Sequence, residues 1–183
     1  MASTLAVDAG APRRVTARFM AGHPARWIGL GFGSGLSPRA PGTVGTLWAW
    51  AAFLVLDAWL DAQTWGLVIA VSLVVGWWAC TRTAQHLQLA DPGAIVWDEV
   101  VAFWIILWLL MPAPWWAQLG AFALFRFFDA AKPGPVGWAD RLFKQRSGQP
   151  IGWAQGAGIL LDDLVAAFCT LFWIAAWLRL WNW

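Results

Sequence analysis

Charge is scarce in this 183-residue chain. Only 12% of its residues are Asp, Glu, Lys or Arg, against about 25% in an ordinary soluble domain, and 60% are hydrophobic. This balance argues against a free-standing soluble protein, and equally against a disordered chain, which needs high charge and low hydrophobicity. The net charge is only +2, with no basic stripe beyond the N-terminal segment, so we expect no nucleic-acid partner. The two cysteines, Cys80 and Cys169, lie inside apolar runs, which excludes a disulfide framework.

Several catalytic motifs are also missing. The two histidines, His23 and His86, do not form a metal-ligand pair, and neither cysteine is followed six residues later by the arginine of a cysteine-phosphatase loop. The sequence contains no P-loop ending in Gly-Lys, and the absence of any Asp-Gly pair excludes the signature of CDP-alcohol phosphotransferases. With these mechanisms excluded, the remaining class of reaction is metal-assisted chemistry on an anionic group.

Apolar residues are concentrated in five runs: Val44–Leu60, Trp65–Cys80, Val100–Met111, Trp115–Phe128 and Leu164–Leu180. A spanning helix needs about 20 residues, or about 17 at the short end, so the third and fourth runs are short. The prolines in Met111–Pro114 predict a helical hairpin turn between these two. We therefore predict an all-α, polytopic membrane bundle of about five apolar helices, in which the short pair either spans the bilayer or forms a hairpin dipping into it. The 18 Trp residues suit a chain with many residues near a membrane interface.

The positions of the basic residues predict the orientation of this bundle. If the five runs alternate in direction, every Lys and Arg except Arg179 falls on one side, which the positive-inside rule makes cytoplasmic. Residues 1–28 carry arginines but lack the uninterrupted apolar core of a signal peptide. We interpret them as a cytoplasmic arm before a single membrane-embedded domain, residues 29–183. Most acidic residues fall on the same side, so we expect the active site at the cytoplasmic interface.

A glycine-rich string, GFGSGLSPRAPGTVGT, covers residues 31–46. Its successive backbone N–H groups, leading into a helix, can cradle an anion, and Ser37, Arg39 and Thr43 would add hydroxyls and a positive charge. The alternative is a flexible re-entrant turn that Thr43 caps before the first apolar helix. The spacing fits neither a dinucleotide-binding fingerprint nor a P-loop, so both interpretations stay open.

Carboxylates mark the start of two apolar helices, as the adjacent pairs Asp98–Glu99 and Asp162–Asp163. A single acidic residue there is explained by the helix dipole. Two adjacent pairs bordering membrane helices are not, because charge in the bilayer is expensive and clustered carboxylates repel one another. A hard divalent cation such as Mg²⁺, which prefers oxygen ligands, would remove that repulsion.

A third charged segment has Arg126, Asp129 and Lys132 at intervals of three residues, which on a helix places them on one face. One interpretation is a chain of interfacial salt bridges with snorkelling cations. The other is a carboxylate ligand between two phosphate-binding cations, and the spacing alone does not choose between them.

Together these strings resemble the phosphatidylglycerophosphatase A family. The matching strings, in order, are GFGSGLSPRAPGTVGT, IVWDE, FRFFDAAKPGP with Asp140-Arg141, and GAGILLDD. The resemblance implies an all-helical lipid phosphatase of the bacterial plasma membrane, which hydrolyses phosphatidylglycerophosphate to phosphatidylglycerol and phosphate with Mg²⁺. The loop between Arg141 and Gly156 is longer and more basic than is usual in the family.

On this hypothesis the carboxylates divide between ligands and a base. We expect Glu99, Asp129, Asp162 and Asp163 to bind the metal. Arg126 and Lys132, with Ser37, Arg39 and Thr43, are expected to bind the phosphate. The catalytic residues are then Asp98, Glu99, Asp129 and Asp163, with Asp98 or Asp163 as the general base for the attacking water.

Two alternatives stay open: an ion-binding or transport module, and a phosphatase acting on another lipid phosphomonoester. Carboxylates at helix ends rather than at mid-membrane favour a phosphatase over a transporter. The sequence makes no prediction of the oligomeric state.

Overall fold

The computed structural model describes residues 15–143 and 150–181, so residues 1–14 of the predicted arm and residues 144–149 of the basic loop lie outside it. Within these ranges the chain forms nine helices and no strands, which confirms the all-α prediction. The helices are α1 (Ala17–Ala21), α2 (Pro24–Gly29), the 3₁₀ helix η1 (Gly31–Leu36), α3 (Pro41–Leu56), α4 (Ala62–Leu87), α5 (Trp97–Leu110), α6 (Trp115–Ala131), α7 (Pro135–Leu142) and α8 (Trp153–Trp181).

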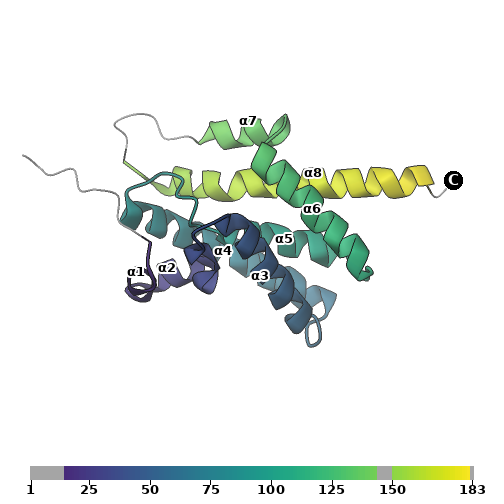
Figure 1. The fold of residues 1–183 in the computed structure, drawn as a ribbon, viewed down its shortest axis with the longest axis horizontal. Coiled ribbons are helices and arrows are strands. Elements are labelled where there is room, and N and C mark those ends of the chain that lie inside the picture. The colour runs from purple at the N-terminus through teal and green to yellow at the C-terminus, as the bar shows by residue number, and fades with distance from the viewer. Residues whose placement is uncertain (1–14, 144–149, 182–183) are drawn as a thin grey trace, which may run out of the picture.

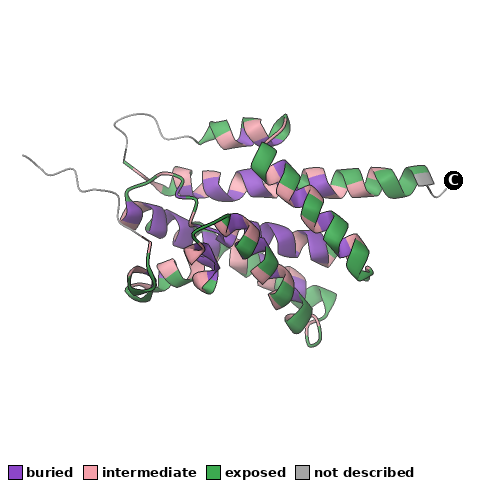
Figure 2. Cartoon of the chain, in the orientation of Figure 1, coloured by how far each residue is buried: buried purple, intermediate pink, exposed green. Residues whose placement is uncertain are grey.

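Helix α5 forms the centre of the fold. It packs against α3, α4 and α8, while α6 and α7 lie against α8 (Figure 1). Val100, Val101, Phe103, Ile106 and Leu107 of α5 are completely buried. Figure 2 shows buried residues concentrated in α5 and in the parts of α4 and α8 beside it, whereas the C-terminal part of α8 is exposed. Polar groups at the start of α5 are therefore enclosed by other helices.

The helix ends follow local chemistry. Asp61 caps α4 by accepting a hydrogen bond from the Thr64 backbone N–H at 2.7 Å. Helix α5 ends at Leu110 and α6 begins at Trp115, so the predicted turn at Met111–Pro114 lies between them. Helix α8 starts at Trp153, well before the apolar run at Leu164, although the residues between these two positions are less hydrophobic than that run.

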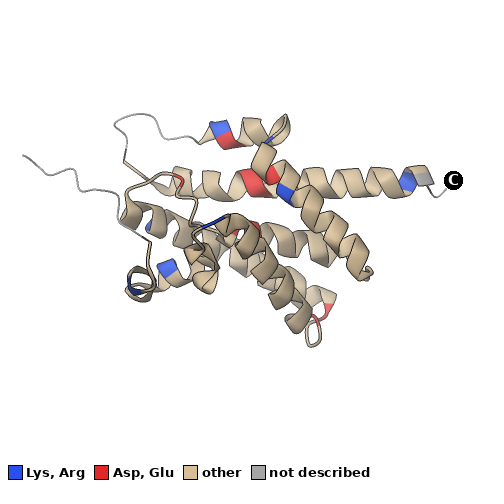
Figure 3. Cartoon of the chain, viewed as in Figure 1, with Lys and Arg blue, Asp and Glu red and all other residues tan. Residues whose placement is uncertain are grey.

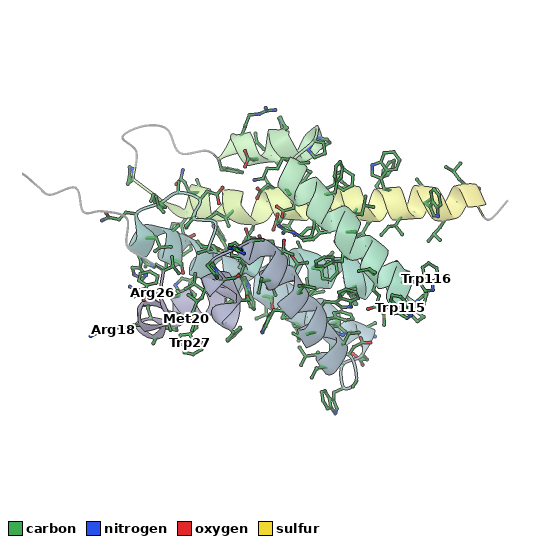
Figure 4. All side chains as sticks on the ribbon, in the orientation of Figure 1. Arg18, Met20, Arg26, Trp27, Trp115 and Trp116 are labelled. Atoms are coloured by element: carbon green, nitrogen blue, oxygen red, sulfur yellow. The ribbon has the colours of Figure 1, made fainter. Side chains whose placement is uncertain are left out.

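Among the residues that the structure describes, two helices are long and apolar enough to cross a membrane: Ala62–Leu87, and Trp153–Leu180 within α8. Only 33% and 39% of their most apolar stretches are buried, so both turn much apolar surface outward. Helix α3 is a shorter apolar helix. Exposed tryptophans lie at both ends of the molecule, with Trp27 beside Arg18 and Arg26 at one end and Trp115 and Trp116 at the other (Figure 4). Tryptophan is enriched at both membrane–water interfaces, and these features together suggest membrane association. The five-span arrangement stays a prediction.

Candidate functional site

Three carboxylates from two helices meet at the start of α5. Asp98 and Glu99 lie in the first turn of α5, and Asp163 reaches them from α8. One oxygen from each lies within 4.8 Å of the others. Glu99 is 9% exposed and Asp163 only 2%, so the cluster is shielded from solvent. The distant sequence segments IVWDE and GAGILLDD are therefore brought together by the packing of α5 on α8.

Each of the three residues has a buried oxygen without a hydrogen-bond partner: Asp98 Oδ1, Glu99 Oε2 and Asp163 Oδ2. Leaving buried carboxylate oxygens unpaired is costly, and neighbouring carboxylates must take up a proton or a cation. An all-oxygen donor set is what hard divalent cations prefer. The cluster can therefore hold a metal ion.

Arg126 supplies a positive charge beside this cluster. Its Nη1 lies 2.5 Å from Asp129 Oδ2 on the same helix and 3.7 Å from Glu99 Oε1 on α5. The ion pair with Asp129 confirms that these two residues share one face of α6. The Asp129 carboxylate in turn adjoins Asp163. The group of Asp98, Glu99, Asp129 and Asp163 thus contains four carboxylates, and Arg126 lies beside two of them, Glu99 and Asp129, which leaves negative charge for a cation to balance. Figure 3 shows acidic residues gathered where α6 crosses α8.

Lys132 forms a second charged group with two other carboxylates. Its Nζ lies 2.6 Å from Asp140 Oδ1 on α7 and 2.5 Å from Asp162 Oδ2 on α8. Partial burial by itself would lower the pKa of Lys132, but hydrogen bonds and charge from Asp140 and Asp162 outweigh it and raise that pKa above its usual value. The ammonium therefore ties α6, α7 and α8 together.

The interval of three residues predicted that Lys132 shares one helical face with Asp129. This prediction is wrong, because Lys132 lies beyond the end of α6. Helix α6 ends at Ala131, and Lys132 has a left-handed backbone with φ of 45°. The reason is local, since Pro133 disfavours a right-handed helical conformation at the residue before it.

The glycine-rich string packs closely against the segment that leads into α5. A Cβ at Gly42 would collide with Glu99 Oε1 and lie 3.1 Å from both Nη atoms of Arg126. A Cβ at Gly45 would lie 2.7 Å from Val96, and one at Gly35 would collide with the Ala94 carbonyl. These glycines therefore let the start of α3 reach the charged cluster.

The other predicted residues of this string lie around the start of α3. Ser37 is half-buried and its hydroxyl donates to the Arg39 carbonyl at 2.8 Å, while Arg39 itself is exposed. The idea that Thr43 caps the helix is wrong: α3 begins at Pro41 after Ala40, which makes no side-chain cap, and Thr43 lies inside the first turn. Proline at the first helical position supplies a preset backbone angle instead of a capping side chain.

The structure adds two residues that the sequence reasoning did not include in the site. Asp140 shares Lys132 with Asp162, and Gly42 provides the space for Glu99 and Arg126. The signal for Gly42 was the glycine-rich string itself, from which we predicted an anion-binding role for the backbone N–H groups. The signal for Asp140 was its place in the Asp140-Arg141 match, but the turn after α6 sets its distance from Lys132. The individual roles of the predicted residues stay predictions.

Known proteins resemble this chain over most of its length. The family model described as phosphatidylglycerophosphatase A matches residues 27–178. Phosphatidylglycerophosphatase A of Escherichia coli is 37% identical over 81% of this chain and 80% of its own length. The Haemophilus influenzae protein of the same name is 35% identical over 79% of this chain and 83% of its own length.

A third relative, from Bacteroides thetaiotaomicron, is named provisionally as a phosphatidylinositol-3-phosphatase. It is 36% identical over 81% of this chain and 89% of its own length. No solved structure matches the chain. The family model covers the helices that bring Asp98, Glu99, Arg126 and Asp163 together. This chain belongs to the phosphatidylglycerophosphatase A family.

Proposed function

We propose that this chain hydrolyses the terminal phosphomonoester of phosphatidylglycerophosphate, releasing phosphatidylglycerol and inorganic phosphate. The observation that carries the proposal is the set of three buried, unpartnered carboxylate oxygens beside Arg126, in a chain of this family. A phosphomonoester carries negative charge on several oxygens, so its hydrolysis needs a cationic site that excludes bulk water.

Asp98, Glu99 and Asp163 would hold a divalent cation, which we propose to be Mg²⁺, and Asp129 lies close enough to Asp163 to complete the set. When bound, the cation would neutralise charge on the phosphate and make a nearby water more acidic. Asp162 as a further ligand remains part of the proposal, although its Oδ2 would first have to leave Lys132.

Arg126 is proposed to orient the phosphate. Its Nε is buried without a hydrogen-bond partner, so the guanidinium keeps a donor for a phosphate oxygen. One carboxylate, Asp98 or Asp163, would act as the base instead of a ligand and accept the proton of the attacking water, and the leaving glycerol oxygen would take a proton from a second water molecule as the ester bond breaks. Arg39, Ser37 and Thr43 lie around the start of α3, beside the Gly42 contact, where they would meet the headgroup.

The proposed setting is the bacterial inner membrane, with residues 29–183 as one membrane-embedded domain and residues 1–28 as a cytoplasmic arm. Residues 164–181 of α8 would extend about 27 Å at 1.5 Å per residue. That length is close to the hydrocarbon thickness of about 30 Å. The carboxylates before residue 164 would then lie at the cytoplasmic interface, the side that the basic residues favour.

A second candidate is a phosphatase for another lipid phosphomonoester. The relative named for phosphatidylinositol 3-phosphate favours it, because its identity to this chain equals that of the relatives named for phosphatidylglycerophosphate to within a few per cent. Both candidates use the same phosphate chemistry and differ in the alcohol that leaves.

The test is phosphate release by the purified full chain in detergent, from phosphatidylglycerophosphate, phosphatidic acid and phosphatidylinositol 3-phosphate. We expect release from the first lipid that needs Mg²⁺, stops with EDTA and returns with excess Mg²⁺. Asp163→Asn, purified in parallel, controls for contaminating phosphatases. Folded protein that releases no phosphate with Mg²⁺ present would refute the proposal, and faster release from either other lipid would establish the second candidate.

A further inference from the structure

An apolar groove lies between α6 and α8. Its volume is about 790 Å³, within the range of roughly 300–1,000 Å³ found for ligand pockets. Its walls include Phe127 and Phe128 from α6, Val165, Phe168 and Phe172 from α8, and the turn at residues 133–135. Among the described residues, the lining contains no charged side chain. The occupant must therefore be apolar along most of its length.

One end of the groove lies at the level of the charged site along both helices. On α6, Phe128 directly precedes Asp129, and the turn at residues 133–135 directly follows Lys132. On α8, Val165 comes two residues after Asp163. From Val165 the groove continues along α8 to Phe172, a distance of about 10 Å at 1.5 Å per residue. On both helices the lining residues at this end of the groove thus lie within one helical turn of the charged residues.

We infer that this groove seats an acyl chain of the phospholipid substrate. A phospholipid is apolar at one end and carries its phosphate at the other, which matches an apolar groove whose lining residues flank Arg126 and Asp129 on α6 and follow Asp163 on α8. This inference rests on the proposed function and adds the binding site for the lipid tail.

The benefit of such a groove is alignment rather than affinity. The bilayer is as apolar as the groove, so moving a lipid tail from one to the other gains little. A tail held along α8 instead fixes the direction from which the headgroup reaches the site, and fixed orientation lowers the barrier of the chemical step. We therefore expect the groove to affect turnover of the intact lipid and to leave the detached headgroup unaffected.

A second apolar groove gives a matched comparison. It has a volume of about 330 Å³ and lies between α4 and α8, where Val74, Trp77 and Leu161 line it. Its lining residues Leu161 and Leu164 flank the carboxylates of α8, but the lining includes no residue of α6 or of the turn after it, which carry Arg126 and Lys132. Filling it should not disturb a tail whose phosphate is held beside Arg126.

The experiment compares Cys169→Trp, which fills the first groove, with Val74→Trp, which fills the second. Each variant is assayed with long-chain phosphatidylglycerophosphate and with its water-soluble deacylated headgroup. For Cys169→Trp we expect the ratio of long-chain to deacylated turnover to fall about tenfold or more. Val74→Trp should keep the wild-type ratio. An unchanged ratio in Cys169→Trp, or an equal fall in both variants, would overturn the inference.

A second measurement does not depend on the variants folding. Wild-type protein is irradiated with phosphatidylglycerophosphate that carries a photoreactive group in its acyl chain, and labelled peptides are mapped. Labelling concentrated in α6 and α8 around Phe128 and Phe168, and displaced by unlabelled substrate, supports the groove. Equal labelling of α4 would refute it. If wild-type protein hydrolyses both substrates and only the groove results fail, the proposed function stands and this inference alone is wrong.

Discussion

Gly42 lies directly against the Glu99 carboxylate, so closely that a Cβ at this position would collide with Oε1. The same Cβ would lie 3.1 Å from both terminal nitrogens of Arg126. The start of α3 therefore forms one wall of the charged cluster, although it contributes no charged side chain there. Because glycine has no side chain, Gly42 leaves the space in which Glu99 and Arg126 lie side by side.

Substituting Gly42→Ala should displace the Glu99 carboxylate, the Arg126 guanidinium, or both. We expect kcat/KM for phosphate release to fall by about 10–100-fold, because small misplacements of positioned groups are costly. Gly120→Ala is the matched control, since a Cβ at Gly120 in α6 meets nothing within 4 Å. Equal activity of both variants would show that Glu99 and Arg126 tolerate displacement.

Removing the charge of one clustered carboxylate should abolish catalysis without unfolding the protein. For Asp98→Asn, Glu99→Gln and Asp163→Asn, we expect turnover to fall at least about 100-fold, equivalent to about 2.7 kcal/mol of barrier. Mg²⁺ binding, measured by calorimetry, should weaken in the same variants. Asp61→Asn is the control, because asparagine still caps α4 at a distance from the site. Wild-type Mg²⁺ affinity in all three cluster variants would refute the proposed metal site.

The shape of the Arg126 side chain should matter as well as its charge. Arg126→Lys keeps a cation but loses the planar guanidinium, whose Nη1 lies beside both Asp129 and Glu99, and we expect activity to fall about tenfold. Arg126→Met removes the cation and should cost about 100–1,000-fold, as loss of a preorganised donor does. Phosphate release under saturating Mg²⁺ measures both. If the lysine variant is as inactive as the methionine variant, the activity depends on the shape of the guanidinium and not on its charge.

Lys132→Met should destabilise the protein, because it leaves Asp140 and Asp162 without their shared cation. We expect a loss of about 1–3 kcal/mol, read as a lower midpoint of thermal unfolding in detergent. The effect of adding Asp140→Asn to that variant should be smaller than its effect alone, because the two residues form one network. An unchanged midpoint with a raised KM would instead identify Lys132 as a phosphate ligand.

The raised pKa of Lys132 also sets the pH dependence of this destabilisation. A group whose pKa is higher in the folded state stabilises fully below its unfolded pKa, and that stabilisation is lost as pH rises through the folded value. The unfolded pKa of lysine is about 10.4. The difference in unfolding midpoint between wild type and Lys132→Met should therefore stay constant between about pH 6 and 9. A difference that disappears within that interval would contradict the raised pKa.

Much of the helical framework was predictable, because a long apolar run has few stable conformations other than a buried or membrane-spanning helix. The runs at Val100–Met111 and Trp115–Phe128 correspond to α5 and α6 to within three residues at each end. The first part of α8 was not predictable in this way, since hydropathy falls before Leu164 while the helix continues. The short helices α1, α2 and α7 depend on packing against α8 or their neighbours rather than on an apolar run of their own.

The charged segments that come together were identifiable from the sequence, but the partner of each individual residue was not. Adjacent residues such as Asp162 and Asp163 point in different directions on a helix, about 100° apart. Asp163 consequently joins Glu99, whereas Asp162 meets Lys132. Which member of an acidic pair faces which neighbour depends on the rotation of α8 against α5 and α6, and no local pattern encodes that rotation.

The distribution of the site over α5, α6 and α8 has a consequence for biosynthesis. Asp98 and Glu99 leave the ribosome first, Arg126 follows, and Asp163 comes last. In the folded protein Arg126 lies beside Glu99, and both residues are made before Asp163. A nascent chain that has not yet reached α8 lacks one of the three clustered carboxylates, so the proposed metal site would be complete only when the last helix has docked.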